Sequence, residues 1–270
     1  MGCAFSGYLV GVRLALRARF VFISLGVLSL VALAAYLSAQ FSGRQPASVA
    51  LDVGISVIRF ALPLVAVLVT QEVLSKEFEG RYFLVSLSYP RARYYFLWSR
   101  FAAIFTLGCA LLFLSALVLA IVVWLVSLGY EQSTPVALGW LFWLSILFVA
   151  LDLLVLVSFA VFLAVSASTS SFVLVGVLGF MLVARSYSAV IELLMRSQYV
   201  VADAEVYRQG VSILSYMIPD LGSLDVRMVA IYNRIEFLPV DWLWRVCSCL
   251  IYVSGLLALS MFLFKRKRFS

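Results

Sequence analysis

Residues 71–100 read QEVLSKEFEGRYFLVSLSYPRARYYFLWSR and gather charge, glycine, proline and aromatic residues into one short segment of an otherwise apolar chain. This segment is too polar to cross a bilayer, yet long apolar runs flank it on both sides. Before Pro90, its apolar residues recur at helical spacing, at Phe78, Tyr82, Val85 and Tyr89. The sequence therefore predicts a short amphipathic helix at a membrane surface, between two membrane-spanning helices.

The composition predicts an integral membrane protein. Of the 270 residues, 65% are hydrophobic and 12% are charged, whereas about a quarter of the residues in soluble domains are charged. Histidine is absent, which excludes Ser-His hydrolases and His-ligated haem or zinc sites. The four cysteines suit small buried hydrophobic positions, so we expect no metal site and no catalytic residue.

Six apolar runs are long enough to cross a bilayer, which needs about 20 residues each, and they span residues 20–40, 51–70, 101–128, 136–165, 172–194 and 242–264. Residues 1–19 carry three arginines among apolar residues, as an interfacial helix does. The fold class predicted is therefore an all-α membrane protein with one transmembrane domain over residues 1–270. With both termini inside, most basic residues lie in the cytoplasm, as multi-pass proteins of the cytoplasmic (inner) membrane require. The net charge of +7 is then explained by basic residues at the membrane edges, which contact lipid headgroups. No nucleic-acid partner is expected.

The segment 71–100 resembles the first cytoplasmic loop of type-2 ABC exporter permeases. In that family a glutamate and a glycine precede a leucine-rich run, a proline, an arginine three positions later and then Gly-Lys. Here the matching residues are Glu77, Glu79, Gly80, Pro90 and Arg93. The chain departs from the pattern in three places: Arg81 stands where threonine is usual after the glycine, the glycine-to-proline distance is one residue longer, and Ser99-Arg100 stands in place of Gly-Lys. The resemblance implies that this loop forms a coupling helix that docks on a separate ATPase subunit. The implied contact residues are Glu77, Phe78, Glu79, Gly80, Arg81, Tyr82, Val85, Tyr89, Pro90 and Arg93.

The residues 195–241 form a second informative region, too long for a simple turn. Their Pro219, Asp220, Leu221 and Asp225 resemble a Pro-Asn-Leu stretch that permeases of this family carry before their last crossing. The resemblance implies short external gate helices that dip into the outer leaflet.

The charged residues predicted to lie within the membrane are Arg59, Asp152, Arg185 and Glu192. Each costs about 2.5 to 3.5 kcal/mol at the centre of a membrane helix. Arg59 and Asp152 have opposite signs at similar depth, so either they pair or each is satisfied separately by a backbone carbonyl or by snorkelling.

The leading functional hypothesis is the transmembrane subunit of an ABC exporter. The chain has no phosphate-binding G-x-x-x-x-G-K-[ST] motif, so ATP and magnesium are expected in a partner ATPase dimer and not as cofactors of this chain. The resemblance also implies a second permease chain. The alternatives are a membrane-embedded lipid-modifying enzyme that uses Asp152 and Glu192, and a scaffold subunit that transports nothing.

The predicted topology places residues 197–240 outside the cytoplasm and both termini inside. A cysteine introduced at Ser197 should therefore react with an impermeant thiol reagent in intact cells, and one introduced at Ser270 should not. Labelling of position 270 but not of position 197 would reverse the orientation.

Overall fold

The computed structural model describes residues 2–17, 19–75, 77, 93–129, 136–167, 169–196 and 219–266. All regular structure in these ranges is helical. As the sequence predicts, the described residues include six helices long and apolar enough to cross a membrane. These helices are α2 (Phe20–Phe41), α3 (Pro46–Thr70), α6 (Arg93–Leu128), α7 (Trp140–Ser166), α8 (Ser170–Arg196) and α11 (Trp242–Arg266).

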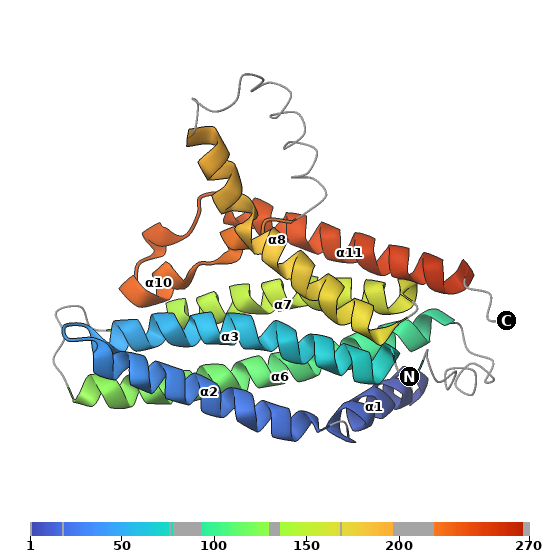
Figure 1. Cartoon of the computed structure of the whole chain (residues 1–270), viewed down its shortest axis with the longest axis horizontal. Coiled ribbons are helices and arrows are strands. Elements are labelled where there is room, and N and C mark those ends of the chain that lie inside the picture. Colours follow the sequence, from blue (N-terminus) through green and yellow to red (C-terminus); the bar gives the residue numbers. More distant parts are fainter. Residues whose placement is uncertain are drawn as a thin grey trace.

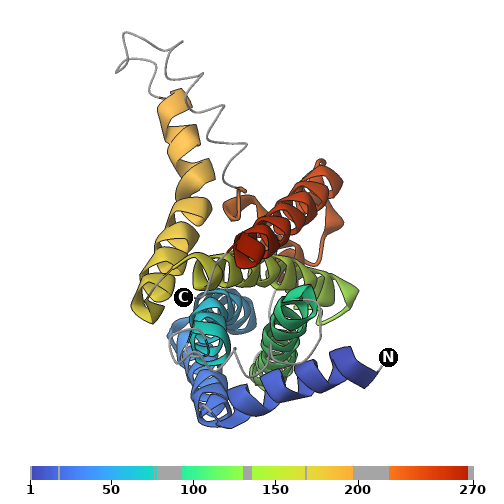
Figure 2. The same cartoon turned by 90° about the vertical axis from the view of Figure 1, so that its right-hand side faces the viewer.

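The helices α3 and α7 form the inside of the bundle. In each of them 67% of the most apolar stretch is buried, compared with 22–28% in α2, α8 and α11. Figure 1 shows α2, α3, α6 and α7 side by side along the long axis of the molecule. The helix α8 crosses the others obliquely, and its last turns leave the bundle (Figures 1 and 2).

The N-terminal helix α1 (Gly2–Arg17) lies across the bundle instead of continuing into α2 (Figure 2). The change of direction occurs at Arg19, which has the left-handed backbone angle φ of 63°. Arg13 and Arg17 are exposed on α1, together with Leu9 and Leu16. This mixed basic and aliphatic face fits the interfacial helix expected for residues 1–19.

Two glycines allow α1 to approach α6 closely. They stand four positions apart, at Gly7 and Gly11, so they lie on the same face of α1. A Cβ atom on Gly7 would lie 2.9 Å from the Ser99 Oγ, and one on Gly11 would lie 2.9 Å from the Ala103 Cβ. Both distances are too short for ordinary packing, so larger residues would push the two helices apart.

The C-terminal end of α3 continues into a single π-helical turn, η1 (Gln71–Ser75). The Gln71 side chain donates a hydrogen bond of 2.8 Å to the Ser170 carbonyl at the start of α8. Residues 78–92, which hold the predicted coupling helix, lie outside the described residues.

Within the described residues 219–241, where the sequence predicts gate-like helices, three short helices precede α11: η2 (Gly222–Leu224), α10 (Arg227–Tyr232) and η3 (Ile235–Phe237). Figure 1 shows α10 at the opposite end of the molecule from α1 and from the two termini. The segment is held there by apolar burial, since Leu221, Leu224 and Val229 are each at most 2% exposed.

The close contact between α1 and α6 can be tested with Gly11→Leu. We expect the larger side chain to destabilise the docking of α1 by about 1–3 kcal/mol, because the Ala103 Cβ cannot move without its backbone. The midpoint of thermal unfolding in detergent should fall. The matched control is Gly26→Leu on α2, where a Cβ atom would meet nothing within 4 Å. Equal midpoints for the two variants would contradict the packing described here.

Candidate functional site

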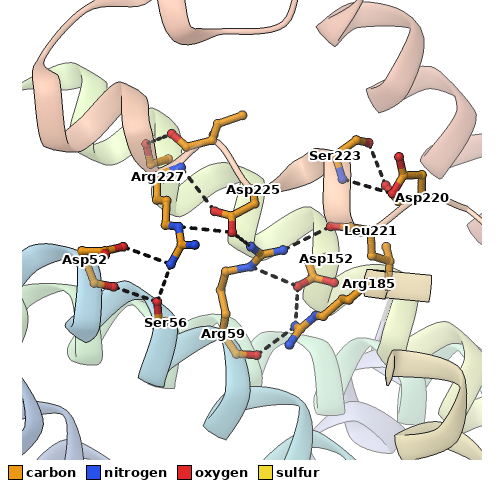
Figure 3. Close-up of polar contacts among 12 residues, drawn as sticks. Asp52, Ser56, Arg59, Asp152, Arg185, Asp220, Leu221, Ser223, Asp225 and Arg227 are labelled. Carbon is orange, nitrogen blue, oxygen red and sulfur yellow. Dashed lines mark hydrogen bonds and ion pairs between the residues drawn. The ribbon is translucent and has the colours of Figure 1, made fainter. Parts of the chain in front are cut away.

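Three arginines and three aspartates form a connected set of ion pairs between the spanning helices and the segment around α10, which we call the charge network (Figure 3). Two residues come from α3, one each from α7 and α8, and two from the segment around α10. The members are Asp52, Arg59, Asp152, Arg185, Asp225 and Arg227.

Asp152 is the most deeply buried carboxylate of this network, with a side chain only 2% exposed. Its Oδ2 lies 2.5 Å from an Arg185 terminal nitrogen and 3.6 Å from the Arg59 Nε. Because both guanidinium groups use one oxygen, the other oxygen, Oδ1, has no hydrogen-bond partner among the described residues. Arg185 also donates a hydrogen bond of 2.8 Å to the Arg59 carbonyl, so this cluster ties α3, α7 and α8 together.

The structure places Arg59 and Asp152 in contact, which is one of the two alternatives left open by the sequence, and Arg59 also binds a backbone carbonyl, as in the other alternative. Arg185 is the closer partner of Asp152, and Arg59 has its shortest ion pair elsewhere. The fourth predicted intramembrane charge, Glu192, belongs to α8, and its side chain lies outside the described residues.

Arg59 also holds the segment that precedes the last crossing. Its NH1 lies 2.5 Å from the Asp225 Oδ2, and its NH2 donates a hydrogen bond of 3.1 Å to the Leu221 carbonyl. Figure 3 shows the Arg59 guanidinium between the Asp152 and Asp225 carboxylates. Residues predicted separately, as intramembrane charges and as gate residues, thus meet at one guanidinium group.

Sequence reasoning missed the outer part of the network. The Arg227 NH1 lies 3.0 Å from the Asp52 Oδ1 and donates a hydrogen bond of 2.7 Å to the Ser56 Oγ. The Arg227 Nε lies 3.4 Å from the Asp225 Oδ2. A signal was present on α3, because Asp52, Ser56 and Arg59 follow one another at spacings of four and three and share one helix face.

Two of the predicted gate residues, Pro219 and Asp220, do not join the charge network. The Asp220 Oδ1 accepts a hydrogen bond of 3.2 Å from the Ser223 N–H, so this side chain stabilises the turn of η2. Pro219 is buried at the start of the segment. Two backbone contacts complete the docking: the Leu221 N–H donates to the Ala184 carbonyl at 3.1 Å, and the Ser145 hydroxyl donates to the Val226 carbonyl at 3.2 Å.

A separate ion pair, outside the charge network, lies beyond the C-terminal end of α3. The Glu77 Oε1 is 2.6 Å from the Arg100 NH2, and the two side chains are 14% and 4% exposed. Burial raises the pKa of the Glu77 carboxyl above its usual value, although the Arg100 guanidinium opposes that shift. Arg100 also donates a hydrogen bond of 3.3 Å to the Gly7 carbonyl on α1, and its guanidinium lies 5.3 Å from the centre of the Phe96 ring.

Among the predicted ATPase-contact residues, the structure describes the side chain of Glu77 alone. Arg93 is the first residue of α6, but its side chain lies outside the described residues. The remaining predicted contact residues, Phe78, Glu79, Gly80, Arg81, Tyr82, Val85, Tyr89 and Pro90, also lie outside them. The described residues contain no group of three His, Cys, Asp or Glu that could hold a metal ion.

Neither a scan against protein-family models nor a search of curated proteins found a match for the chain. The resemblance to type-2 ABC exporter permeases therefore depends on the sequence motifs quoted above.

The charge network predicts which pairs of substitutions compensate each other. Asp152→Asn leaves the partly buried Arg185 guanidinium beside a neutral group and should destabilise the protein by about 3–5 kcal/mol. Adding Arg185→Gln removes the unpaired charge and should restore most of the folded protein, measured as monodisperse protein in detergent. Adding Arg59→Gln to Asp152→Asn should restore less, because Arg59 keeps Asp225 as its partner. Equal rescue by the two second substitutions would contradict the assignment of Arg185 as the main partner.

Proposed function

We propose that this chain is the transmembrane permease subunit of an ABC exporter in the cytoplasmic membrane, driven by a separate ATPase dimer. The observation that carries the proposal is the buried ion pair between Glu77 and Arg100. It joins the two ends of the segment that resembles the coupling loop, and it connects this segment to the N-terminal helix.

The connection matters because a coupling loop has to transmit motion. Glu77 follows the end of α3 and η1, while Arg100 lies in α6, so the ion pair holds the two crossings together at the base of the loop. The hydrogen bond from Arg100 to the Gly7 carbonyl adds α1 to the same contact. A force applied to the loop by an ATPase would thus reach three helices through buried and poorly hydrated contacts, which solvent weakens little.

The proposal also includes a second permease chain. The helices α2, α8 and α11 have large exposed apolar side chains along their outer faces, for example Phe22, Val175 and Ile251. Such faces suit lipid and the contact with another membrane helix bundle alike. They leave room for a second chain beside this one without rearrangement of the inner helices α3 and α7.

The alternative functions have less support. An acid–base enzyme needs a carboxyl group that a substrate can reach, but the Asp152 side chain is 2% exposed and lies between two guanidinium groups. In a scaffold that transports nothing, the six charged side chains in or beside the spanning helices could serve only to fix the helix arrangement, at a cost in the membrane. The burial of Asp152 therefore argues against the enzyme, and the purification experiment below separates a transporter from a scaffold.

Affinity purification of the tagged chain from its native membranes tests the proposal. An ATPase subunit should copurify with the unchanged chain, and Tyr82→Asp should reduce its recovery by about tenfold or more, as loss of a central aromatic contact does. The matched control is Tyr232→Asp, because Tyr232 is exposed on α10 at the opposite end of the molecule. Absence of an ATPase from the unchanged preparation, or equal recovery with both variants, would reject this function.

A further inference from the structure

The segment 219–232, which we call the docked segment, meets the spanning helices across a boundary that divides the charge network into two neutral groups. The docked segment contributes one acid and one base, Asp225 and Arg227. The helices α3, α7 and α8 contribute two acids and two bases, Asp52, Arg59, Asp152 and Arg185. Separation of the two parts would therefore leave the charges of the network members balanced on either side, which lowers the electrostatic cost of such a movement. The further acid of the docked segment, Asp220, bonds within the segment itself and does not join the network.

Arg59 is the residue that contacts both sides of this boundary. Its NH1 and NH2 bind the docked segment, at the Asp225 carboxylate and the Leu221 carbonyl. Its Nε faces Asp152 at 3.6 Å, a longer and weaker contact within the spanning helices. The two shortest polar contacts of the Arg59 guanidinium group are thus with the docked segment.

Asp152 provides a second position for the same guanidinium group. Its Oδ2 already serves Arg185 and Arg59, while its Oδ1 is buried and has no hydrogen-bond partner among the described residues. A guanidinium and a carboxylate prefer two parallel hydrogen bonds. If Asp225 moved away, Arg59 could therefore turn toward Asp152 and use the Oδ1 atom in place of the lost carboxylate.

We propose that Arg59 is a two-position switch that controls the release of the docked segment. In the docked position Arg59 binds Asp225 and Leu221, and in the released position it binds Asp152 through the Oδ1 atom. Asp225 keeps Arg227 as a partner on the segment itself, since the Arg227 Nε lies 3.4 Å from it. Because Leu221, Leu224 and Val229 are buried in the docked position, the docked state is the more populated one. This inference goes beyond the proposed function, because it involves no ATPase and no substrate.

Distance measurements between two spin labels on the purified full-length chain test the switch. One label is placed at Met228→Cys on α10 and the other at Leu147→Cys on α7, where the native side chains are 48% and 58% exposed. The four native cysteines are replaced by alanine. The parent chain should show a main short distance, and Asp225→Asn should increase the longer-distance population about tenfold, as expected for loss of one charge-assisted hydrogen bond.

The decisive comparison removes the second position of Arg59. The added pair of substitutions is Asp152→Asn and Arg185→Gln, made in the Asp225→Asn variant. Together they remove one negative and one positive charge, so the net charge does not change further, but the Asp152 carboxylate is lost. The longer-distance population should then fall back toward the parent value, because neither position offers Arg59 a carboxylate and the Leu221 carbonyl is within its reach only in the docked state. If the network were merely a structural brace, losses would accumulate and this population would rise further.

A population in this triple variant equal to or above that of Asp225→Asn would overturn the proposal, as would an unchanged distance distribution in Asp225→Asn. Should the triple variant fail to fold, the double variant Asp152→Asn/Arg185→Gln decides the question in the parent chain. A longer-distance population at or below the parent value supports the switch, and a larger one rejects it.

Discussion

Charged groups in a low-dielectric interior have to be compensated within a few ångströms, and this constraint determines how the central helices are arranged. Asp152 lies in the middle of an apolar helix and cannot remain without a cation nearby. Arg185 and Arg59 meet this need from two different helices, at 2.5 and 3.6 Å. Because each of these contacts tolerates little displacement, the rotations and depths of α3, α7 and α8 are fixed relative to one another. Apolar packing alone would leave such long uniform helices free to slide.

The helix α3 connects the two polar sites of the protein. Asp52, Ser56 and Arg59 lie on the face that meets the docked segment, and the same helix continues into η1, which ends two residues before Glu77. A shift or rotation of α3 would consequently change the contacts of the charge network and those of the ion pair with Arg100 together. This continuity is a physical route between the two ends of the molecule, and it requires no contact between the sites themselves.

Much of the fold could be predicted from the sequence because hydropathy is a property of each residue and its neighbours. The apolar runs give the six spanning helices to within a few residues at most ends. The larger differences have local causes: α3 begins at Pro46, an ordinary first helical residue, before its apolar run starts. The helix α6 begins at Arg93, so its first turns contain Arg100 and Ser99, which face α1 instead of lipid.

A polar contact could be predicted from the sequence only where the depth of two residues in the membrane and the opposite signs of their charges were enough to suggest a pair. Arg59 and Asp152 satisfied that test, since both are lone charges near the middle of apolar runs. The closeness of Arg185 depends on the oblique path of α8, and the approach of Asp225 depends on the folding of the segment around α10, which no periodicity encodes. Asp52 was missed because polar residues near the ends of spanning helices are ordinary at membrane interfaces. Arg227 was missed because it belongs to the short helix α10, whose position beside α3 the sequence does not indicate.

The contact between α1 and α6 shows why two departures from the family pattern suit each other. Where the resembled permeases have Gly-Lys, this chain has Ser99 and Arg100. A lysine is a single point charge, whereas the planar guanidinium of Arg100 binds Glu77, donates to the Gly7 carbonyl and lies against the Phe96 ring at the same time. Ser99 is larger than glycine, and the space it needs is supplied from the other side, where Gly7 has no side chain. The small residue that allows close approach is thus on α1, and the close helix contact brings the Gly7 carbonyl within reach of Arg100.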